Sequence, residues 1–497
     1  MLSTRVTKTA SGASAVQIVR YENRRTVVVR HLGSTHDKEE LTALKQSAAA
    51  WIDKTTHQSS LFPSEQLSRT LPLDKCQYIG FRYGLLHENL SKLFTIFKFH
   101  LLGNKLLTDL VLARIIEPGS KFQSLEFLKQ FLGISHPRCE LYRQLPTMIC
   151  LQDKVEAKVL AVAKREFAFN FSLVFYDVTT LYFESFAEDE LRMPGFSKDN
   201  KFQQPQILIG LLVTTEGFPV AYQIFKGNTF EGHTLIPVVS AFKRKHKIGS
   251  LTVVADAAMI SLENIAALRQ SNLHYVVAAR TANLSPKLIV KISAKLRQQD
   301  GATVRIPTDD YGDLICEFSV KRFAKDQREM NKQIRKAEHL LQNPSAIKRT
   351  KFIKMNNQNG YSFNTKLLEK TQLLLGVKGY YTNLGSDVND RLIVGHYHNL
   401  WQVEHAFRIA QNDLQMRPLY HFKEHTIKVH ILICFMALAV CKYMELKTAK
   451  STKHFIKKLK TVTDARILNK LTNEEFILRS DIDSETKQLL SKLGLSY

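Results

Sequence analysis

The sequence lacks closely spaced cysteine pairs and, in its first residues, an apolar stretch. Its six cysteines are spread along the chain without any Cys-x-x-Cys pair: Cys76, Cys139, Cys150, Cys316, Cys434 and Cys441. This distribution fits reduced thiols better than a disulfide framework or a zinc site. The first residues, MLSTRVTKTASGASAVQ, contain no apolar stretch of the kind that a secretory signal needs. We therefore expect an intracellular protein.

Long hydrophobic runs are also missing. The longest one, Ile431–Cys441, has 11 residues, whereas a helix that spans a bilayer needs about 20. We predict that this run is part of a buried helix, within TIKVHILICFMALAVCKYMEL. The chain of 497 residues, 44% of them hydrophobic, is long enough for two or three domains with real cores.

Acidic residues are scarce relative to basic ones. The chain has 46 Asp and Glu against 70 Lys and Arg, a net charge of +24, and a pI near 9.6. Such an excess indicates a polyanionic partner, most often a nucleic acid, with an anionic membrane surface as the alternative.

The hydrophobic patterns predict an α/β protein with a mixed sheet and flanking helices. Buried strands are expected in SLVFYDVTTLYFES, QILIGLLV, PVAYQIF, SLTVVADAAMI and HYVVAAR, and a returning strand in QLLLGVKGYYTNL. Residues 59–73 contain two prolines and are expected to form a linker. The predicted divisions are an N-terminal hairpin and helix (1–58), a mainly helical region (59–170), the first part of the core (171–280), a basic insertion subdomain (281–375), the second part of the core (376–445) and a basic helical tail (446–497).

Two acids occur at unusual places in the strands. Asp177 lies in the middle of a strand with apolar neighbours on both sides, and Asp256 ends another strand. Each has a structural alternative, because an Asp at such a place often caps the next helix or accepts hydrogen bonds from loop amides. For Asp256 a helix does follow, so capping remains open there. For Asp177 the apolar neighbours make capping a weaker explanation.

A third acid lies in DRLIVGHYHNLWQVEHAFRIAQNDLQMRPLYH, residues 390–421. At helical spacing, Tyr397, Leu400, Trp401, Phe407 and Gln411 share a face with Glu404. The pattern therefore predicts a carboxylate inside an apolar stripe, and burying it without a partner is costly. Two interpretations stay open: an ion pair with Arg408 one turn later, or a carboxylate directed at a metal ion.

Asp177, Asp256 and Glu404 together have the chemistry of a hard-cation site. Carboxylates from two strands and a later helix suit Mg²⁺ or Mn²⁺. Two such ions activate an attacking hydroxyl and stabilise the leaving oxygen at a phosphorus atom, and a basic surface attracts the phosphodiester. We expect these three residues to be catalytic and metal-binding, with two ions and nucleic acid as the substrate.

Several segments, taken together, resemble the DDE transposases of bacterial insertion sequences. They are ARIIEPGSK, YDVTTLYFES, GFSKDNKFQQPQILIGLLVTTEGFPVAYQIFKGNTFEGHT, VVADAAM and YHNLWQVEHAFRIAQNDLQMRPLYH. Within that family the chain resembles the group with a Tyr-x2-Arg-x3-Glu-x6-Lys signature. The resemblance runs over residues 15–445.

This resemblance implies an RNase H-like core in which Asp177, Asp256 and Glu404 hold the metal ions. It also implies binding to terminal inverted repeats, cleavage at both ends, insertion by 3′-hydroxyl attack into target DNA, and a homodimer or higher multimer on DNA. The expected location is the bacterial cytoplasm, associated with the nucleoid, with no membrane partner.

The signature is incomplete in this chain. Tyr397 and Glu404 match it, whereas Leu400 stands in place of the arginine and Gln411 in place of the lysine. Arg408 is a candidate for replacing part of the missing charge. The residues expected to contact DNA are Tyr397, Arg408 and Gln411 near the acids, and Lys321, Arg322, Lys351 and Lys354 in a basic stretch.

Three functions remain compatible with the sequence. The first is an active cut-and-paste transposase. The second is a DNA-binding protein with a weakened or inactive core, supported by Leu400 and Gln411. The third is a nuclease on the same fold, which cuts DNA without joining it.

Overall fold

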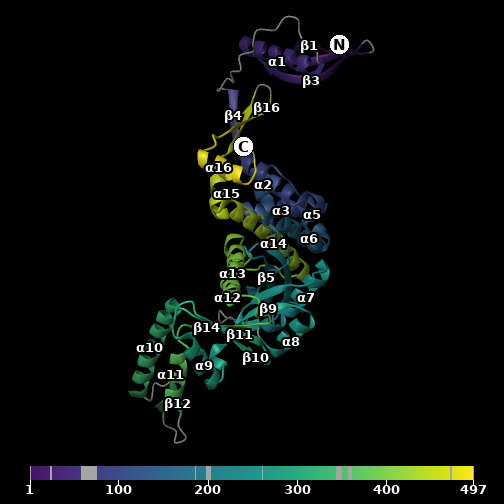
Figure 1. The fold of residues 1–497 in the computed structure, drawn as a ribbon. Helices are drawn as coiled ribbons and strands as arrows, with labels where there is room; N and C mark the ends of the chain where they lie inside the picture. Colours follow the sequence, from purple (N-terminus) through teal and green to yellow (C-terminus); the bar gives the residue numbers. More distant parts are fainter. Residues whose placement is uncertain are drawn as a thin grey trace. The chain divides into compact units, whose positions relative to one another are not determined.

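The computed structural model describes residues 2–22, 25–56, 75–184, 186–196, 203–259, 261–342, 350–355, 361–470 and 473–495. The chain forms two compact units, which are coloured by sequence in Figure 1. The first comprises residues 1–92, 125–135 and 453–497, and the second comprises residues 93–124 and 136–452. The predicted linker at residues 59–73 lies outside the described residues, as do residues 197–202 of one motif.

An eight-stranded mixed sheet forms the centre of the second unit, with the strand order β10-β11-β14-β9-β8-β5-β6-β7. The strands are β5 (Leu173–Tyr182), β6 (Gln206–Val213), β7 (Pro219–Lys226), β8 (Thr252–Ala255), β9 (His274–Ala279), β10 (Thr303–Thr308), β11 (Gly312–Phe318) and β14 (Val377–Thr382). β8 pairs in parallel with both β5 and β9, and the other neighbouring pairs are antiparallel. The predicted mixed α/β sheet is confirmed.

The sheet is covered on both faces at β6, the strand next to the β7 edge, where all eight residues are buried. Gly210 in β6 leaves room for the aromatic ring of the neighbouring strand. A Cβ at this position would lie 2.4 Å from the hydroxyl oxygen of Tyr176. That hydroxyl donates a hydrogen bond of 2.7 Å to Oγ1 of Thr234. A larger residue at position 210 would therefore displace Tyr176 from the core.

Helices flank the sheet, as expected for the alternation of strands and helices in the sequence. They are α7 (Leu235–His246), α8 (Leu262–Gln270), α9 (Pro286–Leu296), α12 (Asp390–His398), α13 (Trp401–Arg408) and α14 (Glu424–Thr448), with the short turns η4 (Glu231–His233), η5 (Ala257–Met259) and η6 (Thr281–Asn283) and the π-helical segment η8 (Ile409–Asp413). Within the described part of the chain, α14 alone is long and apolar enough to cross a membrane, and 94% of its most apolar window is buried inside the protein. The predicted buried helix is confirmed.

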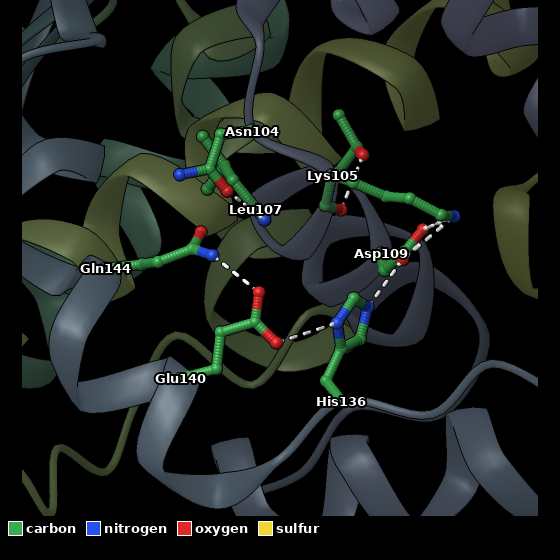
Figure 2. Close-up of polar contacts among 8 residues, drawn as sticks. Asn104, Lys105, Leu107, Asp109, His136, Glu140 and Gln144 are labelled. Carbon is green, nitrogen blue, oxygen red and sulfur yellow. Dashed lines mark hydrogen bonds and ion pairs between the residues drawn. The ribbon is translucent and has the colours of Figure 1, made fainter.

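The helical region before the sheet contains η2 (Phe99–Leu102), α3 (Lys105–Ile116), α4 (Lys121–Phe127), η3 (Leu128–Leu132), α5 (Arg138–Ile149) and α6 (Gln152–Phe167). A polar network ties α3 to the start of α5 (Figure 2). The buried carboxylate of Asp109 lies 2.7 Å from Nε2 of His136 and 3.2 Å from Nζ of Lys105. Nδ1 of His136 lies 3.6 Å from Glu140. Because both ring nitrogens of His136 face carboxylates, the network holds the residues just before α5 against α3.

The predicted insertion subdomain, residues 281–375, needs a correction. β10 and β11 lie within this range, yet β11 pairs with β14 and extends the main sheet. The separate part begins after Phe318, with α10 (Val320–Gln342), β12 (Ile353–Met355), β13 (Tyr361–Phe363) and α11 (Thr365–Leu373). It has a small core of its own around Met330, Ala337, Phe352 and Leu375. The sequence prediction missed the boundary because sheet pairing over such a distance leaves no local pattern.

The first unit contains two three-stranded sheets. One pairs β1 (Leu2–Lys8), β2 (Ser14–Glu22) and β3 (Arg25–Thr35), packed on α1 (Lys38–Thr56), which confirms the predicted hairpin and helix and adds β1. The other has the order β16-β15-β4, with β4 (Cys76–Arg82), β15 (Asp464–Asn469) and β16 (Glu474–Arg479). The remaining helices are α2 (Gly84–Ile96), α15 (Thr452–Lys460) and α16 (Ser484–Lys492). The predicted helical tail, residues 446–497, contains α15 and α16 and in addition β15 and β16. β15 completes its hydrogen bonds with β4, far away in sequence.

Candidate active site

Asp177 and Asp256 belong to neighbouring parallel strands. The register pairs Phe175 of β5 with Val254 of β8. Asp177 comes two residues after Phe175, within β5, and Asp256 comes two residues after Val254, directly after the end of β8. The two acids therefore occupy matching positions on strands that neighbour each other at about 4.8 Å. Asp177 is half-buried and Asp256 is exposed.

Glu404 lies on α13, which packs against β5. A pocket of about 320 Å³ is lined by both Asp177 and Glu404. The other residues that line it are Val178, Thr179, Phe407, Arg408, Gln411, Asn412 and Arg417. The structure thus brings together two of the three predicted acids in one pocket. It also places Arg408 and Gln411, two predicted DNA contacts, beside them.

The surroundings of Glu404 differ from the sequence prediction. Glu404 is exposed, although its spacing placed it inside an apolar stripe. The reason is a break in the helix: α12 ends at His398, α13 begins at Trp401, and Leu400 N–H bonds back to the Tyr397 carbonyl in a tighter turn. The break separates the buried Tyr397 and Leu400 from the face that carries Glu404. Among the described residues Glu404 forms no ion pair with Arg408, so the ion-pair interpretation is not what the structure shows.

Asp256 is held by Tyr397. The hydroxyl of Tyr397 donates a hydrogen bond of 3.0 Å to Oδ1 of Asp256. Burial, together with the Asp256 carboxylate, raises the pKa of this hydroxyl above its ordinary value of 10, so it remains a donor. The following helix, α8, is capped by Ser261, whose side chain accepts a hydrogen bond from Asn264 N–H. The capping interpretation of Asp256 is therefore wrong for α8.

Lys378 is a cation of this site that the sequence prediction missed. Its Nζ lies 4.3 Å from the centroid of the Tyr397 ring, in reach of a cation–π interaction. Burial and the charge of Arg322 lower the pKa of Lys378, while Asp256, Glu317 and Glu404 act in the opposite direction. A single lysine in a strand gives no pattern, so only the fold reveals that Lys378 faces the acids.

Leu400 and Gln411 are the two positions that depart from the signature. Leu400 is buried with 6% of its surface exposed, so it belongs to the core. Gln411 lies in η8, and its Nε2 donates a hydrogen bond of 2.6 Å to Oγ1 of Thr179. This bond ties the signature segment to β5, two residues beyond Asp177. Gln411 therefore positions the pocket wall without contributing a charge.

The four basic residues predicted from the insertion divide into two pairs. Lys321 and Arg322 are exposed at the start of α10, and Arg322 acts electrostatically on Lys378 near the acids. Its guanidinium also pairs with Asp326 at 3.4 Å. Lys351 and Lys354 are exposed, and Lys354 lies in β12. All four residues lie on the insertion. Arg322 lies near the acids, whereas Lys351 and Lys354 come later in the insertion.

The three carboxylates supply the oxygen ligands that Mg²⁺ or Mn²⁺ prefers. Within the described residues, however, no three His, Cys, Asp or Glu side chains gather closely enough to hold a metal ion. One oxygen of Asp256 accepts the Tyr397 hydroxyl. The donor set therefore fits a divalent ion by its chemistry, and binding an ion requires Asp256 and Glu404, which are exposed, to turn toward Asp177.

Comparison with known proteins identifies a family for most of the second unit. Residues 170–440 match the family model described as the transposase DDE domain, which covers the sheet, the insertion and α13. No curated protein matches the sequence. Among solved structures, the cryo-EM structure of the piggyBac transposase synaptic complex with hairpin DNA matches with a TM-score of 0.35 and 11% identity, over 61% of this chain and 56% of the piggyBac chain.

The fold and the site thus define a mixed α/β protein in which Asp177 and Asp256 occupy matching positions on two interior strands and Glu404 shares a pocket with Asp177. The chain belongs to the family of transposase DDE domains. DDE transposases generally use divalent metal ions.

Proposed function

We propose that this protein is a cut-and-paste transposase of an insertion sequence, with Asp177, Asp256 and Glu404 as its catalytic acids. The observation that carries the proposal is the matching register of Asp177 and Asp256 on parallel strands, together with the pocket that Asp177 shares with Glu404. The order β7-β6-β5-β8-β9, antiparallel and then parallel, supports an RNase H-like core.

In this proposal the three carboxylates would hold two Mg²⁺ or Mn²⁺ ions, which would supply an activated hydroxyl and stabilise the leaving oxygen. The side chains around them position the acids. Tyr397 fixes one oxygen of Asp256, and Gln411 joins the signature segment to β5 through Thr179. Arg408 and Arg417 line the pocket beside the acids and attract the phosphodiester.

DNA is delivered by the basic surface. We assign phosphate contacts to Arg408 and Lys378 near the acids, and to Lys321, Arg322, Lys351 and Lys354 on the insertion. The bound DNA consists of the terminal inverted repeats and the target, and a homodimer or higher multimer brings the two ends together.

A weakened enzyme is the second candidate, favoured by the surroundings of two residues. Leu400 is buried, so no signature arginine extends from this position toward DNA. Gln411 uses its amide to bind Thr179 and carries no charge. In this candidate the protein still binds the ends and cuts them slowly or not at all.

The deciding experiment is incubation of the purified protein with a plasmid that carries the DNA flanking its own gene. Reactions with Mg²⁺ and with EDTA are compared, with Asp177→Asn as the matched variant. Breaks at the element ends, present only for the wild-type protein with Mg²⁺, are expected. Specific binding without breaks would favour the weakened enzyme, and cuts scattered over the plasmid would favour a nuclease.

A further inference from the structure

A second pocket, of about 770 Å³, adjoins the acidic site. It shares Gln411, Asn412 and Arg417 with the pocket of Asp177 and Glu404. Its other wall comes from the ARIIEPGSK motif, through Arg114, Gly119 and Ser120. The motif has no role in the proposed chemistry so far, so its place beside the acids needs an explanation.

Two buried basic residues of this motif belong to this region: Arg114 lines the pocket, and Lys121 contacts His421, which lines it. Arg114 is 4% exposed and Lys121 is 7% exposed. Nη1 of Arg114 donates to the Leu414 carbonyl at 3.4 Å, and its Nε has no hydrogen-bond partner. Nζ of Lys121 lies 2.8 Å from Nε2 of His421. Within the described part of the chain, neither cation has a carboxylate partner at ion-pair distance.

The histidines of the pocket do not supply the missing negative charge. Nε2 of His421 accepts a hydrogen bond from the Lys121 ammonium. Burial and Lys121 lower the pKa of His421 to about 3. His430 bonds to the Met416 carbonyl at 3.1 Å, and burial and Arg114 hold its pKa well below the ordinary value. Both rings are therefore neutral. Among the described residues that line this pocket, Glu184 is the one acid, and it is exposed.

The buried Arg114 guanidinium, and Lys121 whenever it is protonated, carry a desolvation cost that the protein's own groups do not offset. Burial and Arg114 lower the pKa of Lys121 to about 7. An anion in the pocket would offset it. A guanidinium with a free Nε–H suits a phosphate oxygen, because Arg presents its donors as a planar fork. The shared wall with the acidic site places such an anion next to the reacting strand.

We propose that the pocket lined by Arg114 and by His421, the partner of Lys121, binds a phosphate group of the DNA strand held at Asp177 and Glu404. This proposal rests on the proposed transposase function, because it names a contact of the same substrate. A free phosphate ion has the same chemistry, so the experiment separates the two sources.

The first arm tests the anion site without any DNA. Thermal unfolding of the full chain is followed in sodium sulfate and in sodium chloride of equal ionic strength. The general effect of sulfate on stability is measured in the same way with Lys154→Met, a control at an exposed lysine of α6. The wild type and Lys154→Met are expected to gain more Tm from sulfate than Lys121→Met, which removes the cation and keeps the apolar stem. Equal gains in all three would overturn the anion site.

The second arm identifies the source of the phosphate. An end oligonucleotide is prepared with one uncharged methylphosphonate at each position in turn, and its binding is measured in EDTA. Neutralising the phosphate that occupies the pocket is expected to weaken wild-type binding about 10-fold, the scale of one charge-assisted hydrogen bond. For Lys121→Met, the same methylphosphonate is expected to weaken binding much less. Arg114→Gln provides a second variant, and Lys121→Met keeps the test valid if Arg114→Gln does not fold.

The outcomes separate the proposals. Coupling between Lys121 and one phosphate supports the DNA contact. A sulfate effect without such coupling overturns it in favour of a free anion. If the wild type binds no end DNA at all, the transposase proposal fails, while the sulfate arm still reports whether the pocket holds an anion.

Discussion

The hydroxyl of Tyr397 donates a hydrogen bond to Oδ1 of Asp256, across 141 positions of the chain. Tyr397 is therefore a positioning residue for an acid that would otherwise turn freely into solvent. Partners that orient a metal ligand typically contribute a factor of 10 to 100 in metal affinity or activity.

Tyr397→Phe tests this relationship. The cleavage rate is expected to fall about 10- to 100-fold and the Mg²⁺ concentration for half-maximal rate to rise, because Asp256 loses its fixed orientation. Tyr380→Phe is the control, since the Tyr380 hydroxyl faces His398. A rate loss with an unchanged Mg²⁺ requirement would contradict the positioning role.

Asp177→Asn and Glu404→Gln are expected to lower the rate of Mg²⁺-dependent cleavage by more than about 100-fold. This loss is larger than the one expected when a residue that only orients a metal ligand is removed. Binding to end DNA is expected to stay equal or become tighter, because each change removes a negative charge. Cleavage assays and binding titrations are run on the same preparations. Loss of folding in both variants, seen by circular dichroism, would instead assign the acids a structural role.

Gln411→Lys restores the cation of the signature. It is expected to tighten end binding and to steepen its dependence on salt by about one unit per added phosphate contact, with faster cleavage if charge limits the reaction. The measurement is a binding titration over a series of salt concentrations. Gln411→Met is the control, because it removes the bond to Thr179 without adding charge. Equal behaviour of both variants would contradict a role for charge at position 411.

Lys378→Met removes the cation beside Tyr397. The slope of log affinity against log salt is expected to decrease by about one unit, with a slower cleavage rate. Lys378→Arg keeps the charge and is expected to keep the slope. If Lys378→Met leaves the slope unchanged, Lys378 acts within the protein and does not contact DNA.

The stability of the protein is expected to rise between pH 7 and pH 8.5. Burial and Arg114 lower the pKa of Lys121 to about 7, whereas in the unfolded chain it is 10.5. The unfolded state therefore binds more protons in this range, and the free energy of unfolding increases by at most about 1.4 kcal/mol per pH unit.

Lys121→Met is expected to remove this rise, as measured by denaturant unfolding at several pH values. The other groups facing Lys121 are Arg114, His421, His430 and Cys434. They do not titrate in this window, because the pKa values of both histidines are lowered and that of the Cys434 thiol is raised. Equal pH dependence in the two proteins would contradict the lowered pKa of Lys121.

The sequence by itself determined the strands that carry the acids. The alternation and the apolar runs around Asp177 and Asp256 predicted β5 and β8, because burial of apolar side chains follows a local period. The apolar run at residues 431–441 likewise predicted the buried α14. The net charge of +24 indicated a polyanionic partner without reference to any fold.

Only the tertiary structure decided which groups meet. Tyr397 and Asp256, Lys378 and Tyr397, and Arg114 and Leu414 are joined by contacts across long stretches of chain, and such contacts leave no periodic pattern. The exposure of Glu404 depended on a break in the helix between His398 and Trp401. Pairing of β15 with β4 and of β11 with β14 was likewise decided by backbone hydrogen bonds that form only when distant segments come together.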